Sequence, residues 1–134
     1  MNISSTDGRV STNVGGKDTW QALTATVRVL LKNQEKSIPY VFEFLTSGKC
    51  PNEKCLEAAR QFNMVRDELT KFSPDKMVYD EHDLKKLPPW GADISPVITS
   101  CGNYFTSGDG YDLLSEIVRV FTYASYAKCG VHIV

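Results

Sequence analysis

Basic residues are not in excess in this sequence of 134 residues. Fifteen lysines and arginines stand against sixteen acidic residues, which gives a formal net charge of −1. Proteins that bind nucleic acid usually carry a basic excess or a clustered basic stripe, and neither occurs here. We therefore do not expect a nucleic acid as the partner.

Long apolar stretches are also missing. A membrane-spanning helix needs roughly 20 consecutive apolar residues, and the longest apolar run of this sequence is far shorter. Residues 1–8 contain no charged segment followed by an apolar one, which is the pattern of a secretory signal. From these two absences we expect no membrane partner and a cytoplasmic location.

Familiar catalytic motifs are absent too. No serine lies in a G-x-S-x-G elbow. The glycine-rich residues 107–110 lack the lysine of a phosphate-binding loop. Asp109 and Asp112 would also repel a phosphate at the start of the helix that follows. We interpret 107–110 as a helix cap and expect no cofactor.

Cysteine is scarce, with four residues, and their spacing fits no common metal site. Cys50 and Cys55 are separated by four residues, whereas zinc ligands usually come in pairs that are two residues apart. Because a chain without a secretory signal stays in a reducing compartment, disulfides are not expected. We expect all four to be buried free thiols, which behave as small hydrophobes. A structural zinc site and a nucleophilic cysteine are the alternatives.

The composition is that of a folded protein, with 42% apolar and 23% charged residues. Apolar residues recur at helical spacing in three segments. The first is expected over 18–33, with Asp18 as the N-cap and Gln21 completing a capping box. The second follows Pro51 and ends before Pro74, and the third begins after Asp109 and stops at Gly130. The side chains expected to face the core are Trp20, Leu23, Val27, Leu30, Leu31, Leu56, Ala59, Phe62, Val65, Leu69, Phe72, Leu113, Leu114, Ile117, Val118, Phe121 and Ala124.

Residues 39–45 have an ambiguous pattern. Their β-branched and aromatic content favours a strand, whereas Pro39 at the start and Gly48 just past the end favour a short helix. We favour the helix.

Four short segments have the character of strands: 9–14, 76–79, 102–106 and 131–134. In the last one, alternation places His132 on the face opposite its apolar neighbours, so we expect it to lie outward or partly buried. Together these elements predict a single α+β domain over residues 1–134, with three to four helices packed on a small β-sheet.

Segment 73–91 is the most informative part of the chain. It holds four carboxylates, one of the two histidines, two adjacent prolines and Trp90 within nineteen residues. Loops of this kind often carry recognition. Trp90 has two interpretations: a large ring that clamps the loop onto the core, or an exposed anchor for a partner.

The acidic residues of this loop allow three interpretations. A hydrolase site formed by Asp80, His82 and Asp83 would need these side chains to converge in a cleft. The alternatives are a solvated charged loop and an acidic recognition surface. We favour a surface role, because no second concentration of His, Asp or Glu exists to complete an active site.

The order of these motifs resembles a family of bacterial immunity proteins that are encoded beside polymorphic toxins, including toxins delivered by cell contact in contact-dependent growth inhibition. The resemblance covers most of residues 9–134, with Tyr79 where a tryptophan is expected. It is carried by Val65-Arg66-Asp67-Glu68-Leu69, Ser73-Pro74-Asp75-Lys76-Met77-Val78-Tyr79-Asp80, Pro88-Pro89-Trp90, Ile94-Ser95-Pro96, Asn103-Tyr104-Phe105 and Ser107-Gly108-Asp109-Gly110.

The resemblance implies a non-enzymatic cytoplasmic protein that binds and neutralises the C-terminal domain of one cognate toxin. Many such toxins are nucleases with basic channels, which an acidic loop could meet with fast, steered association. A small hydrolase and a general protein-interaction module remain the alternatives. The residues expected to form or border the toxin-binding surface are Asp75, Tyr79, Asp80, Glu81, Asp83, Trp90 and Asp93.

Overall fold

A computed structural model describes residues 1–134 and confirms the α+β class: one four-stranded antiparallel sheet, four α-helices and two short 3₁₀-helices. The elements in chain order are β1 (Asn2–Ser5), β2 (Ser11–Asn13), α1 (Lys17–Leu30), η1 (Lys32–Ser37), α2 (Pro39–Ser47), β3 (Lys49–Cys50), α3 (Asn52–Leu69), η2 (Pro74–Lys76), α4 (Leu113–Ala127) and β4 (Val131–Ile133).

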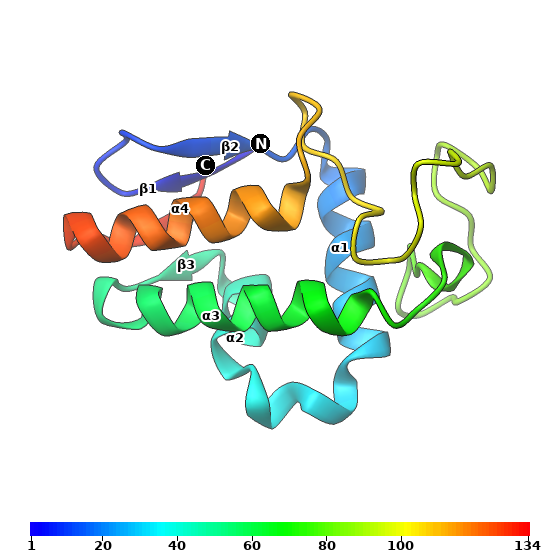
Figure 1. Cartoon of the computed structure of the whole chain (residues 1–134), viewed down its shortest axis with the longest axis horizontal. Coiled ribbons are helices and arrows are strands. Elements are labelled where there is room, and N and C mark those ends of the chain that lie inside the picture. Colours follow the sequence, from blue (N-terminus) through cyan, green and yellow to red (C-terminus); the bar gives the residue numbers. More distant parts are fainter.

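The sheet brings the two ends of the chain together. Its strand order is β2-β1-β4-β3, so the N-terminal strand β1 lies beside the C-terminal strand β4, with Ile3 opposite Ile133 (Figure 1). The predicted strands at 9–14 and 131–134 are present as the edge strand β2 and as β4. Strand β1 was not predicted, because three of its four residues are polar and lack the apolar alternation of a strand.

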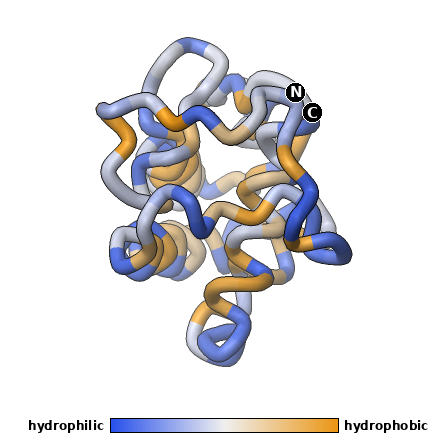
Figure 2. Tube along the Cα trace, turned by 90° about the vertical axis from the view of Figure 1, so that its right-hand side faces the viewer, coloured by the Kyte–Doolittle hydropathy of each residue, from blue (hydrophilic) through white to orange (hydrophobic).

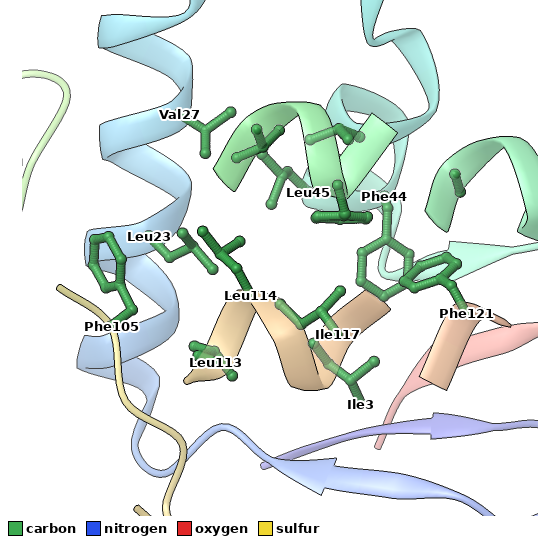
Figure 3. Close-up of a cluster of buried hydrophobic side chains, with 14 of the residues drawn as sticks. Ile3, Leu23, Val27, Phe44, Leu45, Phe105, Leu113, Leu114, Ile117 and Phe121 are labelled. Atoms are coloured by element: carbon green, nitrogen blue, oxygen red, sulfur yellow. The ribbon is translucent and has the colours of Figure 1, made fainter. Parts of the chain in front are cut away.

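Helix α4 lies between the sheet and α3, which runs beside it in the opposite direction (Figure 1). The rings of Phe44, Phe62 and Phe121 meet in this core, with centroids 5.0 Å apart for Phe44 and Phe121 and 5.2 Å apart for Phe62 and Phe121. Figure 3 shows side chains of α4 pointing into the same space as Leu23 and Val27 of α1. Burial of these side chains is the main source of stability.

The start of α1 differs from the prediction. The helix begins at Lys17 after Gly16, and no side chain caps it. Asp18 and Gln21, which were expected to form a capping box, are inside the helix and bind a distant loop instead. The helix ends at Leu30, and η1 takes up the residues beyond it.

Two other helices follow the prediction closely. Residues 39–47 form α2, which ends at Gly48 in the left-handed conformation with a φ of 71°. The Gly48 amide donates a hydrogen bond to the Phe44 carbonyl, and a glycine adopts this backbone conformation without strain. In α3 the expected core face is correct except for Leu56, which is 68% exposed.

Helix α4 has the predicted apolar face but different ends. Its N-cap is Asp112, whose carboxylate accepts a 3.1 Å hydrogen bond from the amide of Ser115, so the expected cap at Asp109 is wrong. The helix stops at Ala127, because Lys128 takes up the left-handed conformation with a φ of 57°. Gly130 lies beyond the helix, where a Cβ atom would be 2.6 Å from the Cys50 carbonyl.

The strands expected at 76–79 and 102–106 do not form. Residues 74–76 make the short helix η2, and Val78 bonds to a side chain of α1 rather than to a neighbouring strand. In the second segment only Thr106 forms an isolated bridge, with Asp112. His132 of β4 is partly buried, as expected.

The cysteine prediction is confirmed as far as bonding is concerned. All four are free thiols; Cys50, Cys55 and Cys101 are buried and Cys129 is partly buried. No group of three or more His, Cys, Asp or Glu side chains is placed to hold a metal ion. None of the helices combines the length and the apolar character that crossing a membrane requires.

Candidate partner-binding surface

The segment between α3 and α4 is the largest irregular part of the molecule. It projects from the end of α3, lies beside α1 and returns to α4, as the green-to-orange trace in Figure 1. We call residues 73–101 the recognition loop. Figure 2, which views the molecule from this side, shows hydrophobic positions interspersed with hydrophilic ones along the tube.

Helix α1 fixes the first part of the recognition loop through its polar face. The Thr26 hydroxyl, which is fully buried, donates to the Val78 carbonyl and accepts from the Val78 amide, both at 3.0 Å. Gln21 donates through Nε2 to the Tyr79 carbonyl at 3.1 Å. These bonds satisfy the backbone of a segment that has no strand partner.

Tyr79 is buried beneath the loop and does not form its outer surface. Only 8% of it is exposed, and its hydroxyl donates a 2.5 Å hydrogen bond to Asp18 Oδ1. That bond, followed by burial, raises the pKa of Tyr79 above its ordinary value. Tyr79 therefore supports the loop from within, and we do not retain it as an anchor for a partner.

Trp90 is packed against the loop and is also partly exposed. Its ring packs edge-to-face on Tyr79 with centroids 6.2 Å apart, and its Nε1 donates to the Tyr104 hydroxyl at 2.8 Å. Yet 42% of Trp90 remains exposed. The ring is thus held in one orientation while part of it stays available for contact.

The two ends of the recognition loop are tied together at its base. The Cys101 amide donates to the Phe72 carbonyl at 2.9 Å, and the Cys101 thiol lies 3.3 Å from the Ser73 carbonyl. Gly102 fits closely against the end of α3, where a Cβ atom would be 2.6 Å from the Thr70 side chain. This closure makes the long loop a defined projection.

Most of the carboxylates that were expected to face a partner already have partners within the protein. Asp80 accepts a hydrogen bond from the His82 amide at 2.9 Å, and Asp83 accepts one from the Lys85 amide at 3.3 Å. These bonds shape the turns of the loop. Four of the five carboxylates nevertheless remain exposed at the surface, and Asp80 is partly buried.

The remaining three carboxylates differ in their contacts. Asp75 accepts a hydrogen bond from the Ser73 hydroxyl, which lowers the pKa of Asp75. Glu81 lies 3.6 Å from the Arg28 guanidinium of α1. Asp93 is exposed and makes no hydrogen bond or ion pair through its side chain. Four of the five carboxylates are therefore held by contacts within the protein, and Asp93 is not.

The histidine and aspartates considered for a hydrolase do not converge. His82 is exposed, with its Nε2 3.8 Å from Glu81, while Asp80 and Asp83 are engaged with backbone amides. None of these three residues lines either of the two hollows described below. The contacts of these three side chains therefore give no support to a hydrolase site.

Exposed apolar side chains are the feature of this loop that the sequence analysis missed. Leu84 is 63% exposed and Leu87 is 60% exposed, and Val97 is also exposed. Leu84 and Leu87 border a hollow of about 170 Å³, whose further lining includes Met77, Pro88, Ala92, Ile94 and Tyr104. The only signal in the sequence was the presence of leucines in a segment without helical or strand periodicity.

A second hollow of about 760 Å³ lies between α1, η1, α2 and the recognition loop. Its lining is mostly polar and carries three cations, Arg28, Lys32 and Lys36, against three carboxylates, Glu35, Glu43 and Glu81. The balanced charge gives this groove no preference for a ligand of one sign.

The edges of the sheet are already occupied in part. The outward carbonyls of the edge strand β2 accept hydrogen bonds from within the protein: Ser11 from the Arg119 guanidinium at 3.0 Å, and Asn13 from the Gly108 amide at 2.7 Å. At the other edge, the Ser47 hydroxyl bonds to both the amide and the carbonyl of Lys49. A partner that adds a strand would have to break these bonds.

The chain was compared with known protein families, curated proteins and solved structures. Residues 5–133 match the model of a protein family described as Immunity protein 70. No curated protein and no solved structure matches the chain.

Proposed function

The chain belongs to the Immunity protein 70 family, and from this premise we propose that it neutralises one cognate toxin domain by binding it directly through the recognition loop. Membership of the family supports the neutralisation of a toxin. The surface that does so, the class of toxin and the place of the encounter belong to our proposal.

The observation that carries the proposal is a set of exposed apolar side chains on a loop that is held in place. Interfaces commonly have an apolar centre that is shielded by a polar rim, and a few large side chains provide most of the binding energy. Leu84, Leu87 and Trp90 would supply such a centre. Because the loop is tied to α1 and closed at its base, little ordering would be required on binding.

We further propose that the toxin is a nuclease that meets this surface with a basic channel. Residues 73–93 carry five carboxylates against three lysines, a net charge of −2. Negative charge near an interface accelerates encounter with a basic partner. Asp75, Asp80, Glu81, Asp83 and Asp93 are assigned this steering role.

No catalytic step is part of the proposal, because inhibition by direct contact needs only a complementary surface. We propose that residues 1–134 act as one binding unit, in the cytoplasm of the cell that makes the toxin. Delivery of the toxin by cell contact is the setting that we propose for this protection.

The test is to mix the protein with the purified C-terminal domain of the toxin encoded beside its gene and to measure binding and toxin activity. We expect a complex and loss of toxin activity at equimolar ratio. A Leu84→Ala and Leu87→Ala double variant should bind at least about tenfold more weakly, as expected for the centre of an interface.

The matched control is Leu56→Ala, which removes an equally exposed leucine from α3. It should leave binding unchanged. If the double variant binds as tightly as the wild type, the recognition loop is not the binding surface. If the wild type neither binds nor inhibits the neighbouring toxin domain, neutralisation by direct contact is wrong.

A further inference from the structure

We propose that Cys50 and Cys55 form an oxidisable pair that a small peroxide converts into a disulfide between the end of β3 and the first turn of α3. This inference does not depend on the proposed toxin-binding function. It rests on the positions of the two sulfur atoms, on a hollow that reaches one of them and on the lack of such access at the other.

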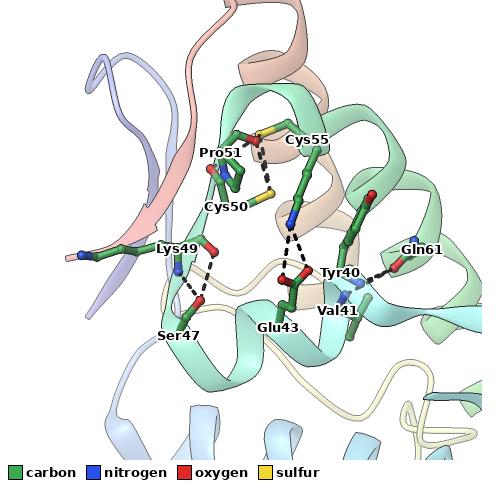
Figure 4. Close-up of polar contacts among 10 residues, drawn as sticks. Tyr40, Val41, Glu43, Ser47, Lys49, Cys50, Pro51, Cys55 and Gln61 are labelled. Atoms are coloured by element: carbon green, nitrogen blue, oxygen red, sulfur yellow. Dashed lines mark hydrogen bonds and ion pairs between the residues drawn. The ribbon is translucent and has the colours of Figure 1, made fainter. Parts of the chain in front are cut away.

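The two sulfur atoms lie in contact. Cys50 Sγ and Cys55 Sγ are 3.9 Å apart, and the Cys55 thiol is also 3.3 Å from the Pro51 carbonyl (Figure 4). A disulfide requires a separation of about 2.05 Å, so the sulfur atoms must approach by about 2 Å. The chain turns at Pro51 into α3, which already brings both residues to the same side of the turn.

A small hollow at the surface reaches Cys50. Its volume is about 40 Å³, and it is lined by Tyr40, Glu43, Ser47, Lys49, Cys50, Pro51 and Lys54. A water-sized molecule needs roughly 10–15 Å³ of such space. Hydrogen peroxide therefore fits, whereas glutathione disulfide is much too large to enter.

The access route determines the order of the chemistry. Cys55 is fully buried and does not line this hollow, so Cys50 is the sulfur that meets the oxidant. The Cys50 thiolate attacks one oxygen of the peroxide, the O–O bond breaks, and hydroxide leaves to take up a proton as water. Cys50 is then a sulfenic acid.

Cys55 completes the reaction as the resolving thiol. Its thiolate attacks the sulfenic sulfur of Cys50, the S–O bond breaks, and a second hydroxide leaves as water. In sum, two thiols and one peroxide give one disulfide and two waters. Both sulfurs are oxidised by one electron each, and the peroxide takes up both electrons.

The surroundings also set how readily the pair reacts. The hydrogen bond with Cys55, together with burial, raises the pKa of the Cys50 thiol above its ordinary value, which keeps the thiolate fraction of Cys50 low. The same hydrogen bond lowers the pKa of the Cys55 thiol, which favours the thiolate that resolves the sulfenic acid. The pair should thus stay reduced under ordinary conditions and respond to sustained exposure to peroxide. The Cys101 thiol contacts the Ser73 carbonyl and not another sulfur atom, and burial raises the pKa of Cys101 to about 11.

The experiment treats the folded wild-type protein with hydrogen peroxide, blocks the remaining thiols with an alkylating reagent and maps the peptides by mass spectrometry. We expect a loss of two hydrogen atoms, a link between Cys50 and Cys55, and full reversal by dithiothreitol. The melting temperature should rise by on the order of 5 °C, since the disulfide restrains the unfolded chain.

Matched variants assign the link. Cys50→Ser and Cys55→Ser should each abolish it, and Cys101→Ser should retain it. Cys129→Ser should also retain the link between Cys50 and Cys55. It is the critical control, because the Cys129 carbonyl lies 3.7 Å from the Cys55 thiol. The wild-type peptide map decides the question even if a serine variant fails to fold.

Three results would overturn the inference. The first is that Cys50 and Cys55 both remain free for alkylation after prolonged treatment. The second is a link that joins Cys129 to either of them. The third is equally fast formation of the Cys50–Cys55 link with glutathione disulfide, since that oxidant cannot use the small hollow.

Discussion

The Tyr79 hydroxyl donates a 2.5 Å hydrogen bond to the Asp18 carboxylate, which joins the recognition loop to the first turn of α1 across 61 positions of the sequence. The ring of the same tyrosine packs edge-to-face with the ring of Trp90. One side chain therefore links the scaffold to the exposed aromatic group of the loop. This relationship leads to the first prediction.

Tyr79→Phe should loosen the loop while leaving the rest of the fold intact. The substitution keeps the ring that packs on Trp90 and removes the bond to Asp18. We expect backbone amides between residues 78 and 91 to exchange roughly tenfold faster with deuterium, as expected for the loss of one hydrogen bond in a locally opening segment. Equal protection in both proteins would show that the bond does not hold the loop.

The alkaline pH dependence of stability should change in the same variant. Because the bond to Asp18 and burial raise the pKa of Tyr79, the folded state holds this proton more tightly than the unfolded state, which releases it at about pH 10. The stability that Tyr79 contributes through its raised pKa is therefore fully present below about pH 10 and is lost as the pH rises through the higher pKa of the folded state.

Urea unfolding between neutral and alkaline pH measures this contribution. The wild type should lose more stability than Tyr79→Phe over the alkaline range. Tyr123 is the matched control, because its hydroxyl binds Asp7 and its pKa is also raised by that bond, yet it lies outside the loop. Tyr123→Phe should remove a separate part of the alkaline loss, so the two effects should add.

Thr26→Val should destabilise the protein by about 2 kcal/mol. The change removes a hydroxyl that serves both the amide and the carbonyl of Val78 in a buried site, and these groups would be left without partners. Valine has nearly the same shape, so packing is preserved. Chemical denaturation monitored by circular dichroism gives the free energy of unfolding.

Thr24 provides a control in the same helix. Its hydroxyl is buried and has no hydrogen-bond partner. Thr24→Val should therefore change stability by no more than about 0.5 kcal/mol, or increase it, because no bond is lost. If both variants lose a similar free energy of unfolding, the loss comes from placing valine in the helix and not from the broken bonds to Val78.

Charge reversal at Asp80, Glu81 and Asp83 should slow association with the toxin domain. At low salt we expect the association rate constant to fall by about tenfold or more, and the difference should shrink as salt screens the charges. Stopped-flow or surface-based kinetics at two ionic strengths would measure both effects. Unchanged kinetics at low salt would remove these three residues from the interface.

The control for this experiment is reversal of three exposed carboxylates elsewhere, Glu53, Asp67 and Asp109. It changes the net charge by the same amount. If the association rate constant falls only for the loop variant, the position of the charges on the loop matters. If it falls equally for both variants, the net charge alone accounts for the effect.

The sequence predicted what depends on neighbours along the chain. Leu113, Ile117 and Phe121 lie at helical spacing, and the face they define is buried as expected. The short helix from Pro39 to Gly48 was also found from its ends, because proline and glycine act through local backbone geometry.

The errors arose where a distant residue decides the outcome. Asp18 fits the local sequence pattern of a helix cap. Its carboxylate instead accepts a hydrogen bond from Tyr79, which is 61 positions away and which no local pattern reveals. Val78 looked like part of a strand, but the Thr26 side chain takes the place of a neighbouring strand. The exposure of Leu84 and Leu87 follows from the path of the whole loop, which no local pattern encodes. The sequence thus pointed to this loop as a candidate surface, which stays a prediction, and missed the exposure of its leucines.

Ala92→Phe should weaken toxin binding by filling the apolar hollow of the recognition loop. Ala92 is exposed and lines the hollow of about 170 Å³ beside Leu87 and Ile94. A volume of this order accommodates one apolar side chain of a partner, and burial of such a side chain contributes about 1.5–3 kcal/mol. We therefore expect roughly a tenfold or greater increase in Kd, with little change in the free energy of unfolding.

Ala92→Ser is the matched control, because it alters the same position without filling the space. Binding measured by calorimetry should be close to that of the wild type. If Ala92→Phe binds as tightly as Ala92→Ser, the toxin does not use the hollow. Leu84 and Leu87 would then act through their exposed outer surfaces, and the double alanine variant would still report their contribution.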